Sequence, residues 1–358
     1  MTMIKSYFSL TKPKVVVLLQ ITALCSVLSH DLLEQYNFSF QQIIETLVKM
    51  LVVFIGGYLT AGGANAINMW YDRDIDPIMR RTSNRAIPSG KISPNNALIF
   101  GVFISIIGVA WFVVMANQVA AFWAAFSIIF YVFIYTAWLK RSTVQNIVIG
   151  GIAGSTPPVI GWAAASDDLS IETDSAINFF DSIFSLGSFM PWFLFLLIFL
   201  WTPPHFWALA LYRSEEYEKV NVPMMPGIKG PKKTLFTMKI YALVLVLLSF
   251  LSPIALDNLK FDEYLFHIFC WTNVILSTWY ASTVFKIDLN EKKDKTGRIP
   301  TAARSFWVSM LYLALIFVVV VMASIGTIGG LIGALISIII IIRNQIKAKK
   351  EINPFSSL

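Results

Sequence analysis

Long apolar runs separated by short charged segments constrain this 358-residue chain more than any other feature. Hydrophobic residues make up 56% of the chain and charged residues 14%, and most runs reach the roughly 20 residues that a helix needs to cross a bilayer. The runs fall at residues 15–33, 43–67, 97–116, 118–139, 144–164, 189–212, 235–256, 264–286 and 305–342. The last is too long for one crossing and holds Gly326, Gly329 and Gly330, where the chain can turn. We therefore predict an all-α, multi-span membrane protein with ten crossings.

Basic residues gather in alternate segments between these runs. They occupy the N-terminus, the loop from Arg73 to Lys91, the pair Lys140-Arg141, the loops at 213–233 and 286–304, and the tail after Arg343. The segment 165–188 instead carries acidic residues and neither Lys nor Arg. Because Lys and Arg concentrate in cytoplasmic loops, we expect the N-terminus and the basic loops to be cytoplasmic. We expect a prokaryotic plasma membrane, since no Arg- and Ser-rich leader is seen, and a basic face that meets membrane lipid rather than nucleic acid.

The second run leads into the segment Asn68-Met69-Trp70-Tyr71-Asp72-Arg73-Asp74-Ile75-Asp76. Asn68, Asp72 and Asp76 recur every four residues, so a helix would place them on nearly one face. Oxygen ligands of this kind suit Mg²⁺, which takes few protein ligands and completes its shell with water and phosphate oxygens. Arg81 and Arg85 follow closely and could bind the same phosphates. The segment therefore predicts a site for a metal-bound diphosphate.

Two residues limit the helical argument. Pro77 disfavours helical geometry at Asp76, so we expect the helix to end or kink before that residue. Asp74 would lie on the other side of the helix from Asp72, so a solvated or salt-bridged role for Asp74 stands at least equally beside metal binding.

The spacing of the charged loops suggests an internal repeat. The two longest charge-dense loops on the predicted cytoplasmic side follow the second and the sixth apolar runs, which are four runs apart. We interpret the chain as one transmembrane domain, 1–358, with two four-helix pseudo-repeats at about 10–142 and 143–290 and then C-terminal spans at 305–342. This arrangement would bring the loops at 68–91 and 213–233 to facing positions, where both could address one ligand.

The residues Asn68, Asp72, Ile75-Asp76, Met79, Arg81-Thr82, Arg85 and Gly90, with their spacing, resemble the signature of the UbiA-type membrane polyprenyltransferases. Further segments resemble the branch of that family that farnesylates protoheme IX. They are Leu10-Thr11-Lys12-Pro13, Tyr135-Thr136, Leu139-Lys140-Arg141, Gly150-Gly151, Pro157-Pro158, Trp201, Pro203-Pro204-His205-Phe206-Trp207 and Val222-Pro223-Met224. The resemblance spans residues from about 8 to 310.

The resemblance implies a helical bundle with a central cavity that opens at the cytoplasmic side. It also implies transfer of a farnesyl group from farnesyl diphosphate to the vinyl group of heme b, giving heme O, with Mg²⁺ as cofactor. Such a product supplies heme-copper terminal oxidases, although the sequence identifies no assembly partner.

The same resemblance assigns roles to individual residues. Asp72 and Asp76 would be catalytic and, with Asn68, would hold Mg²⁺. The diphosphate would be bound by Arg81, Arg85, Lys140, Arg141 and Arg213. The second acidic motif of the family usually has two aspartates, and here Glu216 would supply a metal ligand in its place. His205 is a candidate for binding heme, with structural satisfaction of the backbone near Pro203-Pro204 as the alternative.

Two other functions stay open from the sequence. One is prenylation of an aromatic acid or a quinone precursor, against which the Pro-Pro-His-Phe-Trp segment at 203–207 and the altered second acidic motif argue. The other is a transporter or heme-handling assembly factor. Transporters place charged groups near the middle of the bilayer, whereas most ionisable residues here lie at one interface.

Overall fold

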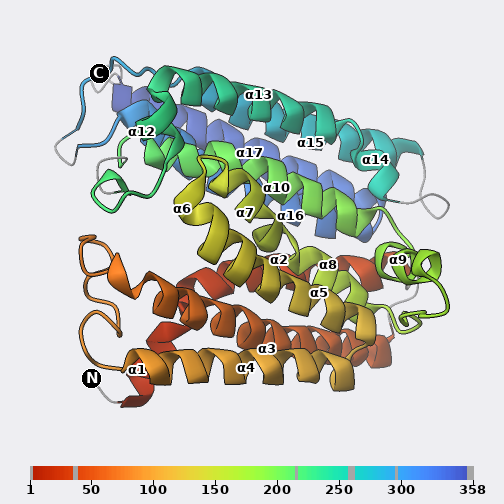
Figure 1. Ribbon diagram of the computed structural model, residues 1–358. Helices are drawn as coiled ribbons and strands as arrows, with labels where there is room; N and C mark the ends of the chain where they lie inside the picture. Colours follow the sequence, from red (N-terminus) through yellow and green to blue (C-terminus); the bar gives the residue numbers. More distant parts are fainter. Residues whose placement is uncertain (1–2, 35–38, 214–216, 257–262, 295–296, 353–358) are drawn as a thin grey trace.

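The computed structural model describes residues 3–34, 39–213, 217–256, 263–294 and 297–352, and within these ranges every regular element is a helix. Long helices lie side by side, and both ends of the chain are at the same end of the bundle (Figure 1). The uninterrupted long helices are α2 (Pro13–Glu34), α3 (Phe40–Tyr71), α4 (Pro94–Met115), α10 (Met190–Ala210), α13 (Pro231–Ser249), α15 (Glu263–Phe285), α16 (Pro300–Ser324) and α17 (Thr327–Ile352).

Two further crossings are composite. In the first, α5 (Gln118–Ile129) continues through the π-helix η2 (Phe130–Leu139) into α6 (Lys140–Ser142). In the second, α7 (Asn146–Ser155) is followed by α8 (Pro157–Ala165). The shorter elements are α1 (Met3–Leu10), η1 (Asp72–Asp74), α9 (Ala176–Phe184), α12 (Met225–Lys229) and α14 (Ser252–Ala255).

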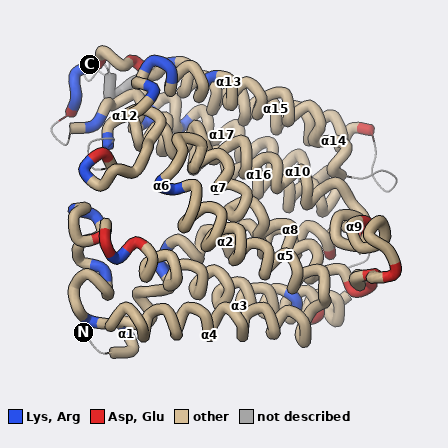
Figure 2. Tube along the Cα trace, in the orientation of Figure 1, with Lys and Arg blue, Asp and Glu red and all other residues tan. Residues whose placement is uncertain are grey.

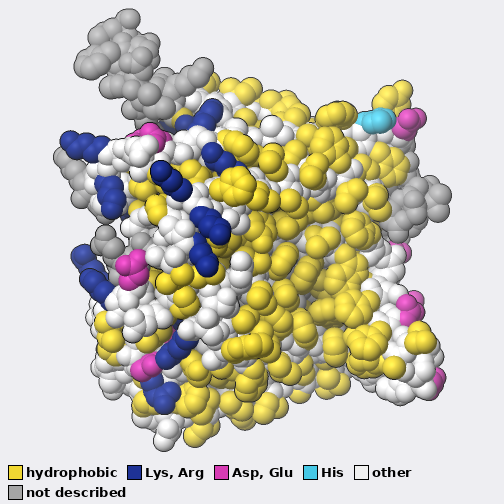
Figure 3. Space-filling view, turned by 45° about the horizontal axis from the view of Figure 1, so that its top comes forward, with side chains coloured by type: hydrophobic (Ala, Val, Ile, Leu, Met, Phe, Trp, Pro, Cys, Tyr) yellow, Lys and Arg dark blue, Asp and Glu magenta, His cyan; other side chains and the backbone are white. Residues whose placement is uncertain are grey.

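The helices confirm a multi-pass membrane protein. Eight helical segments among the described residues are long and apolar enough to cross a bilayer. Apolar side chains form a broad band across the face of the molecule that Figure 3 shows. α13 and α15 were also predicted as spans and pack beside α10 and α16, but they are not among the eight. α13 carries Lys232, Lys233 and Lys239, which lower its hydropathy. The count of ten crossings stays a prediction.

Local sequence explains where several helices begin and end. α3 starts with a capping box, in which the Ser39 side chain accepts from the Gln42 amide and the Gln42 side chain accepts from the Ser39 amide. α4 starts with Ser93 as N-cap and a proline in its first turn. Between α16 and α17 the chain turns at Gly326, whose φ of +123° suits glycine. The predicted turn in the stretch 305–342 is therefore confirmed.

Charge divides the two ends of the bundle. Lys and Arg residues gather at the end that holds the chain termini, whereas α9 and the acidic loop beside it lie at the other end (Figure 2). The predicted separation of the basic loops from the acidic segment is therefore confirmed. Lys49 lies at the acidic end, where its Nζ donates to the Ala165 carbonyl at 2.7 Å and lies 3.2 Å from Asp167 Oδ2.

The loops at 68–91 and 213–233 contact each other at the basic end, as the sequence predicted. Ile75 and Met79 of the first loop form one buried apolar cluster with Val220 and Val222 of the second. This contact joins the early helices to the later ones next to the acidic motif. The division into two pseudo-repeats stays a prediction.

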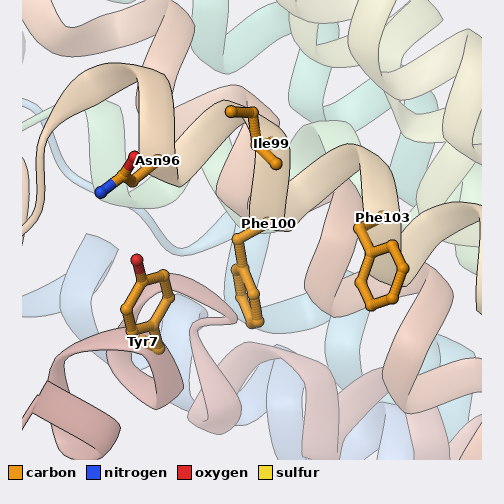
Figure 4. A pocket seen from close by; sticks show the side chains of 5 residues that line it. All are labelled: Tyr7, Asn96, Ile99, Phe100 and Phe103. Atoms are coloured by element: carbon orange, nitrogen blue, oxygen red, sulfur yellow. The ribbon is translucent and has the colours of Figure 1, made fainter.

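A pocket of about 400 Å³ opens between α1 and α4, and its lining is mainly aromatic and aliphatic (Figure 4). Tyr7, Asn96, Ile99, Phe100 and Phe103 line it. None of these residues belongs to the acidic motif on α3 and η1. The central cavity that the family resemblance implies therefore stays a prediction.

Close helix packing depends on glycine where α8 crosses α2. A Cβ atom built on Gly161 would lie 2.3 Å from the backbone carbonyl oxygen of Ala23, which cannot move without shifting α2. A Cβ atom on Gly154, in α7, would meet nothing within 4 Å. The two glycines therefore make a matched pair for testing this contact.

We expect Gly161→Ala to destabilise the protein by about 1–3 kcal/mol, because the methyl group forces α2 and α8 apart. Gly154→Ala should be neutral or slightly stabilising, since alanine favours a helix. Apparent melting temperatures of the detergent-solubilised variants measure the difference. Equal melting temperatures for the two variants would contradict the packing described here.

Candidate active site

The acidic motif lies where α3 ends. α3 ends at Tyr71, Asp72 begins η1, and the Asp76 amide donates to the Asp72 carbonyl at 2.9 Å. Thr82 Oγ1 donates to the Asp76 carbonyl at 2.8 Å and fixes the turn that follows. Asp76 therefore lies beyond the regular helix, as Pro77 predicted, and the placement of Asn68, Asp72 and Asp76 on one face stays a prediction. Both Asp72 and Asp76 are nevertheless buried, because the turn folds back on the helix end.

Asp72 is the most enclosed acid of the motif, with a side chain that is 1% exposed. Its Oδ2 accepts from Lys140 Nζ at 2.5 Å and from Asn68 Nδ2 at 3.1 Å. Its Oδ1 lies 3.7 Å from Arg141 Nη2 and, within the described part of the chain, has no hydrogen-bond partner. A buried carboxylate oxygen without a donor is costly unless a cation or another donor meets it. Asp72 thus has one oxygen held by two hydrogen bonds, and one that forms no described hydrogen bond and faces the Arg141 guanidinium.

Asp76 and Asp74 have different partners. Arg85 Nη1 lies 2.8 Å from both carboxylate oxygens of Asp76, whose side chain is 3% exposed. Asp74 is 54% exposed and binds Arg141 at 2.6 and 2.8 Å. The salt-bridged role expected for Asp74 is confirmed.

The sequence did not predict two side-chain contacts of Asn68. Lys12 Nζ donates to Asn68 Oδ1 at 2.7 Å, and Asn68 Nδ2 also donates to Thr136 Oγ1 at 3.1 Å. Burial, followed by the nearby cations of Arg85 and Lys140, lowers the pKa of Lys12 to about 7. The only signal in the sequence was that Lys12 and Thr136 belong to segments that resemble the family. Nothing in local spacing links Lys12 to Asn68, which lies 56 residues away.

The π-helix η2 carries further site residues on one segment. It contains Thr136 and the stacked rings of Tyr131 and Tyr135, whose centroids are 5.5 Å apart, and it leads directly to Lys140. π-helical turns are rare and often occur at functional sites, because the wider turn changes which side chains face inward. η2 thus carries the Thr136 hydroxyl, which accepts from Asn68, and the two tyrosine rings. Lys140, directly after η2, donates to Asp72.

Other predicted residues lie outside this cluster. Arg81 is exposed, and its Nη2 lies 3.5 Å from the Tyr217 hydroxyl. Arg213 lies over the Tyr212 ring at 6.0 Å and, among the described residues, forms no ion pair with the three aspartates. Glu216 falls outside the described residues. The roles assigned to these three residues stay predictions.

His205 belongs to α10 and packs against α16. Its Nδ1 lies 2.6 Å from Ser309 Oγ, and its ring stacks between those of Trp201 and Phe306 at 4.2 and 4.6 Å. The imidazole thus contacts a hydroxyl of α16, and satisfaction of a carbonyl freed by Pro203 or Pro204 stays a prediction. The heme-binding role of His205 stays a prediction.

The donor set limits which metal this site can hold. In the described residues no three His, Cys, Asp or Glu side chains form a group that could enclose a metal ion. Asp72 Oδ1, Asp76 and Asn68 instead offer a few oxygen atoms next to several cations. This set fits Mg²⁺, which binds through one or two carboxylates and takes its other ligands from water and phosphate.

Comparison with known proteins matches most of the chain. Residues 40–296 match the UbiA prenyltransferase family. The protoheme IX farnesyltransferase of Bartonella bacilliformis is 38% identical over 311 residues, which cover 87% of this chain and 88% of that protein. Two solved structures show the same fold. A digeranylgeranylglyceryl phosphate synthase superimposes with a TM-score of 0.65 at 19% identity, covering 91% of this chain and 99% of its own. A UbiA homolog from Archaeoglobus fulgidus bound to DMAPP and Mg²⁺ gives 0.56 at 14% identity, covering 89% and 99%.

The buried ion pair can be tested by its effect on stability. We expect Lys140→Met to destabilise the protein by about 3 kcal/mol, because it leaves Asp72 buried without its closest cation. This is the lower end of the usual range, since Arg141 remains 3.7 Å from Asp72 Oδ1. The double variant Lys140→Met with Asp72→Asn should recover most of the loss.

Melting temperatures of the single and double variants in detergent measure this coupling. Glu263→Gln is the control, because its pair with His267 is solvent-exposed, with side chains 88% and 66% exposed, and exposed pairs contribute little. Additive effects of Lys140→Met and Asp72→Asn would show that the pair is not coupled in the folded protein.

Proposed function

The chain belongs to the UbiA prenyltransferase family, and from that premise we propose that it transfers a farnesyl group from farnesyl diphosphate to the vinyl group of heme b. The product is heme O. The protein is a membrane-embedded polyprenyltransferase, and the heme acceptor is supported by protoheme IX farnesyltransferases that match most of its length. The observation that carries the proposal is the buried pair of Asp72 and Asp76, ringed by cations at the basic end of an apolar bundle.

The donor diphosphate requires positive charge at the site. We propose that Asn68, Asp72 and Asp76 hold Mg²⁺, which when bound would neutralise charge on the diphosphate. The A. fulgidus homolog bound to DMAPP and Mg²⁺ supports a divalent metal in this fold. Asp72 Oδ1, which forms no hydrogen bond within the described residues, would supply an oxygen ligand for such an ion.

The cations of this chain act on the leaving group. Lys140 and Arg85 pair with Asp72 and Asp76. In the proposal both cations would bind phosphate oxygens of the donor, and the two carboxylates would hold the Mg²⁺. The bond between farnesyl C1 and the diphosphate oxygen breaks, and the diphosphate leaves with the electron pair. We propose that three further arginines bind the diphosphate. Arg81 and Arg141 lie nearer to solvent, and Arg213 belongs to the facing loop at 213–233.

The allylic cation must meet the vinyl group before it meets water. The terminal vinyl carbon forms a bond with farnesyl C1, and the cation that results on the substituent takes up water and loses a proton. The bundle excludes bulk water from the farnesyl chain, and aromatic rings such as Tyr131 and Tyr135 can stabilise a nearby cation by up to about 2 kcal/mol. His205 and Glu216 are proposed to contribute to heme and metal binding respectively.

The location follows from the same charge pattern. We propose that the protein lies in the plasma membrane of a prokaryotic cell, with its basic end and N-terminus facing the cytoplasm. The charged diphosphate of the donor would enter from that side. The alternative acceptors, an aromatic acid or a quinone precursor, share the donor site and differ only in what enters beside the farnesyl chain. A transporter is disfavoured because Asp72 and Asp76 follow the last residue of α3 and pair with cations there, rather than lying in the middle of a membrane-spanning helix.

An acceptor assay tests the proposal. Purified protein given heme b, farnesyl diphosphate and Mg²⁺ should form heme O and release pyrophosphate, and EDTA should stop the reaction until Mg²⁺ is restored. Mass spectrometry of the extracted hemes measures the product. Prenylation of 4-hydroxybenzoate, with heme b left unchanged, would contradict the heme assignment.

Substitution of the acids tests the site. Asp72→Asn and Asp76→Asn should each lower turnover by about 100- to 1,000-fold, because the transition state loses charge stabilisation. Asp74→Asn is the matched control, since Asp74 is exposed and binds Arg141 at the rim, and it should keep most of the activity. Initial rates of heme O formation, with melting temperatures to verify folding, decide between these outcomes. Equal losses in all three variants would refute a special role for the buried pair.

A further inference from the structure

Lys12 lies in a strained corner that aims its side chain at the acidic motif. It connects α1 to α2 with a φ of +50°, a left-handed conformation that is unusual for lysine and disfavoured before a proline. Neighbouring contacts hold this corner on α3. Thr11 Oγ1 lies 2.8 Å from the Tyr58 hydroxyl, and Asn65 Nδ2 donates to the Thr11 carbonyl at 3.2 Å. Because strain of this kind persists only when the surroundings fix it, the direction of Lys12 is a built feature.

The partner of Lys12 differs from the partners of the other cations. Lys140, Arg85 and Arg141 each bind a carboxylate, whereas Lys12 donates to the neutral amide oxygen of Asn68. Lys12 is therefore a fourth basic group beside the three carboxylates of Asp72, Asp74 and Asp76, and its Nζ donates to an amide oxygen rather than to any of them. A partly buried cation without an anion favours an anionic ligand.

We propose that Lys12 binds the diphosphate of the prenyl donor. This inference rests on the proposed function and adds a residue from the first helices to the diphosphate site. An ammonium group has three N–H donors, and the contact with Asn68 uses one of them. Its compact charge on a flexible stem suits phosphate oxygens without a fixed geometry. Asn68 in turn donates to Asp72. Lys12 is therefore linked through Asn68 to the carboxylate that is proposed to hold the metal.

A purely structural role for the ammonium group is poorly supported by the contacts. The corner is fastened to α3 through Thr11, Tyr58 and Asn65, none of which depends on the charge of Lys12. A structural lysine would also affect both substrates alike. A diphosphate ligand would affect the donor and leave heme binding unchanged.

The test uses the full-length protein in nanodiscs with Mg²⁺ and the unreactive donor analogue S-farnesyl thiolodiphosphate. Lys12→Met should weaken binding of the analogue by about 10- to 100-fold, the effect of losing a hydrogen bond to a charged group. Lys12→Arg should restore most of the affinity. Lys14→Met is the matched control, because Lys14 lies two residues further along and is exposed. The KM for farnesyl diphosphate should rise in Lys12→Met while the KM for heme b stays unchanged.

Several results would overturn the proposal. Lys12→Met could bind the analogue like the wild type, or Lys12→Arg could bind no better than Lys12→Met, or both KM values could rise together. If Lys12→Met does not fold, Lys12→Gln removes the charge, keeps a possible hydrogen bond to Asn68, and is judged by the same criteria. Failure of the wild type to make heme O would instead refute the proposed function, so the two failures are distinguishable.

Discussion

The buried contact between Lys140 and Asp72 is the interaction on which the site depends. It joins η2 and α6 to the end of α3 and sets the position of Asn68, which binds Lys12 on one side and Asp72 on the other. A buried ion pair contributes little net stability compared with apolar packing, and it becomes costly if one partner is removed. Its retention at the end of an apolar bundle is therefore best explained by the chemistry of a charged ligand.

The bundle and the site have complementary tasks. Apolar helices provide a water-poor interior, and the charged end holds two buried acids beside cations, Asp72 with Lys140 and Asp76 with Arg85. In the described structure the cations pair with the acids. A bound Mg²⁺ diphosphate would bring both charges to the site, where the carboxylates would hold the metal and the cations would bind phosphate oxygens.

Local patterns in the sequence predicted much of this arrangement. Apolar run lengths located the helices, and Pro77 predicted that the helix ends near Asp76. The family resemblance assigned Arg85, Lys140 and Arg141 to the diphosphate, whereas their ion pairs with Asp76, Asp72 and Asp74 were not predicted. Contacts that depend on distant packing were not predictable. Lys12 reaches Asn68 only because a corner is fastened to α3, and His205 meets Ser309 only because α10 lies against α16.

The central claim is that Asp72 and the donor diphosphate hold one divalent ion together. Titration with Mn²⁺, followed by electron paramagnetic resonance with and without S-farnesyl thiolodiphosphate, tests it most directly. We predict tight Mn²⁺ binding only when the analogue is present, because the described residues offer too few ligands alone, and we predict its loss in Asp72→Asn. Equal Mn²⁺ binding by Asp72→Asn and the wild type, in the presence of the analogue, would contradict the account.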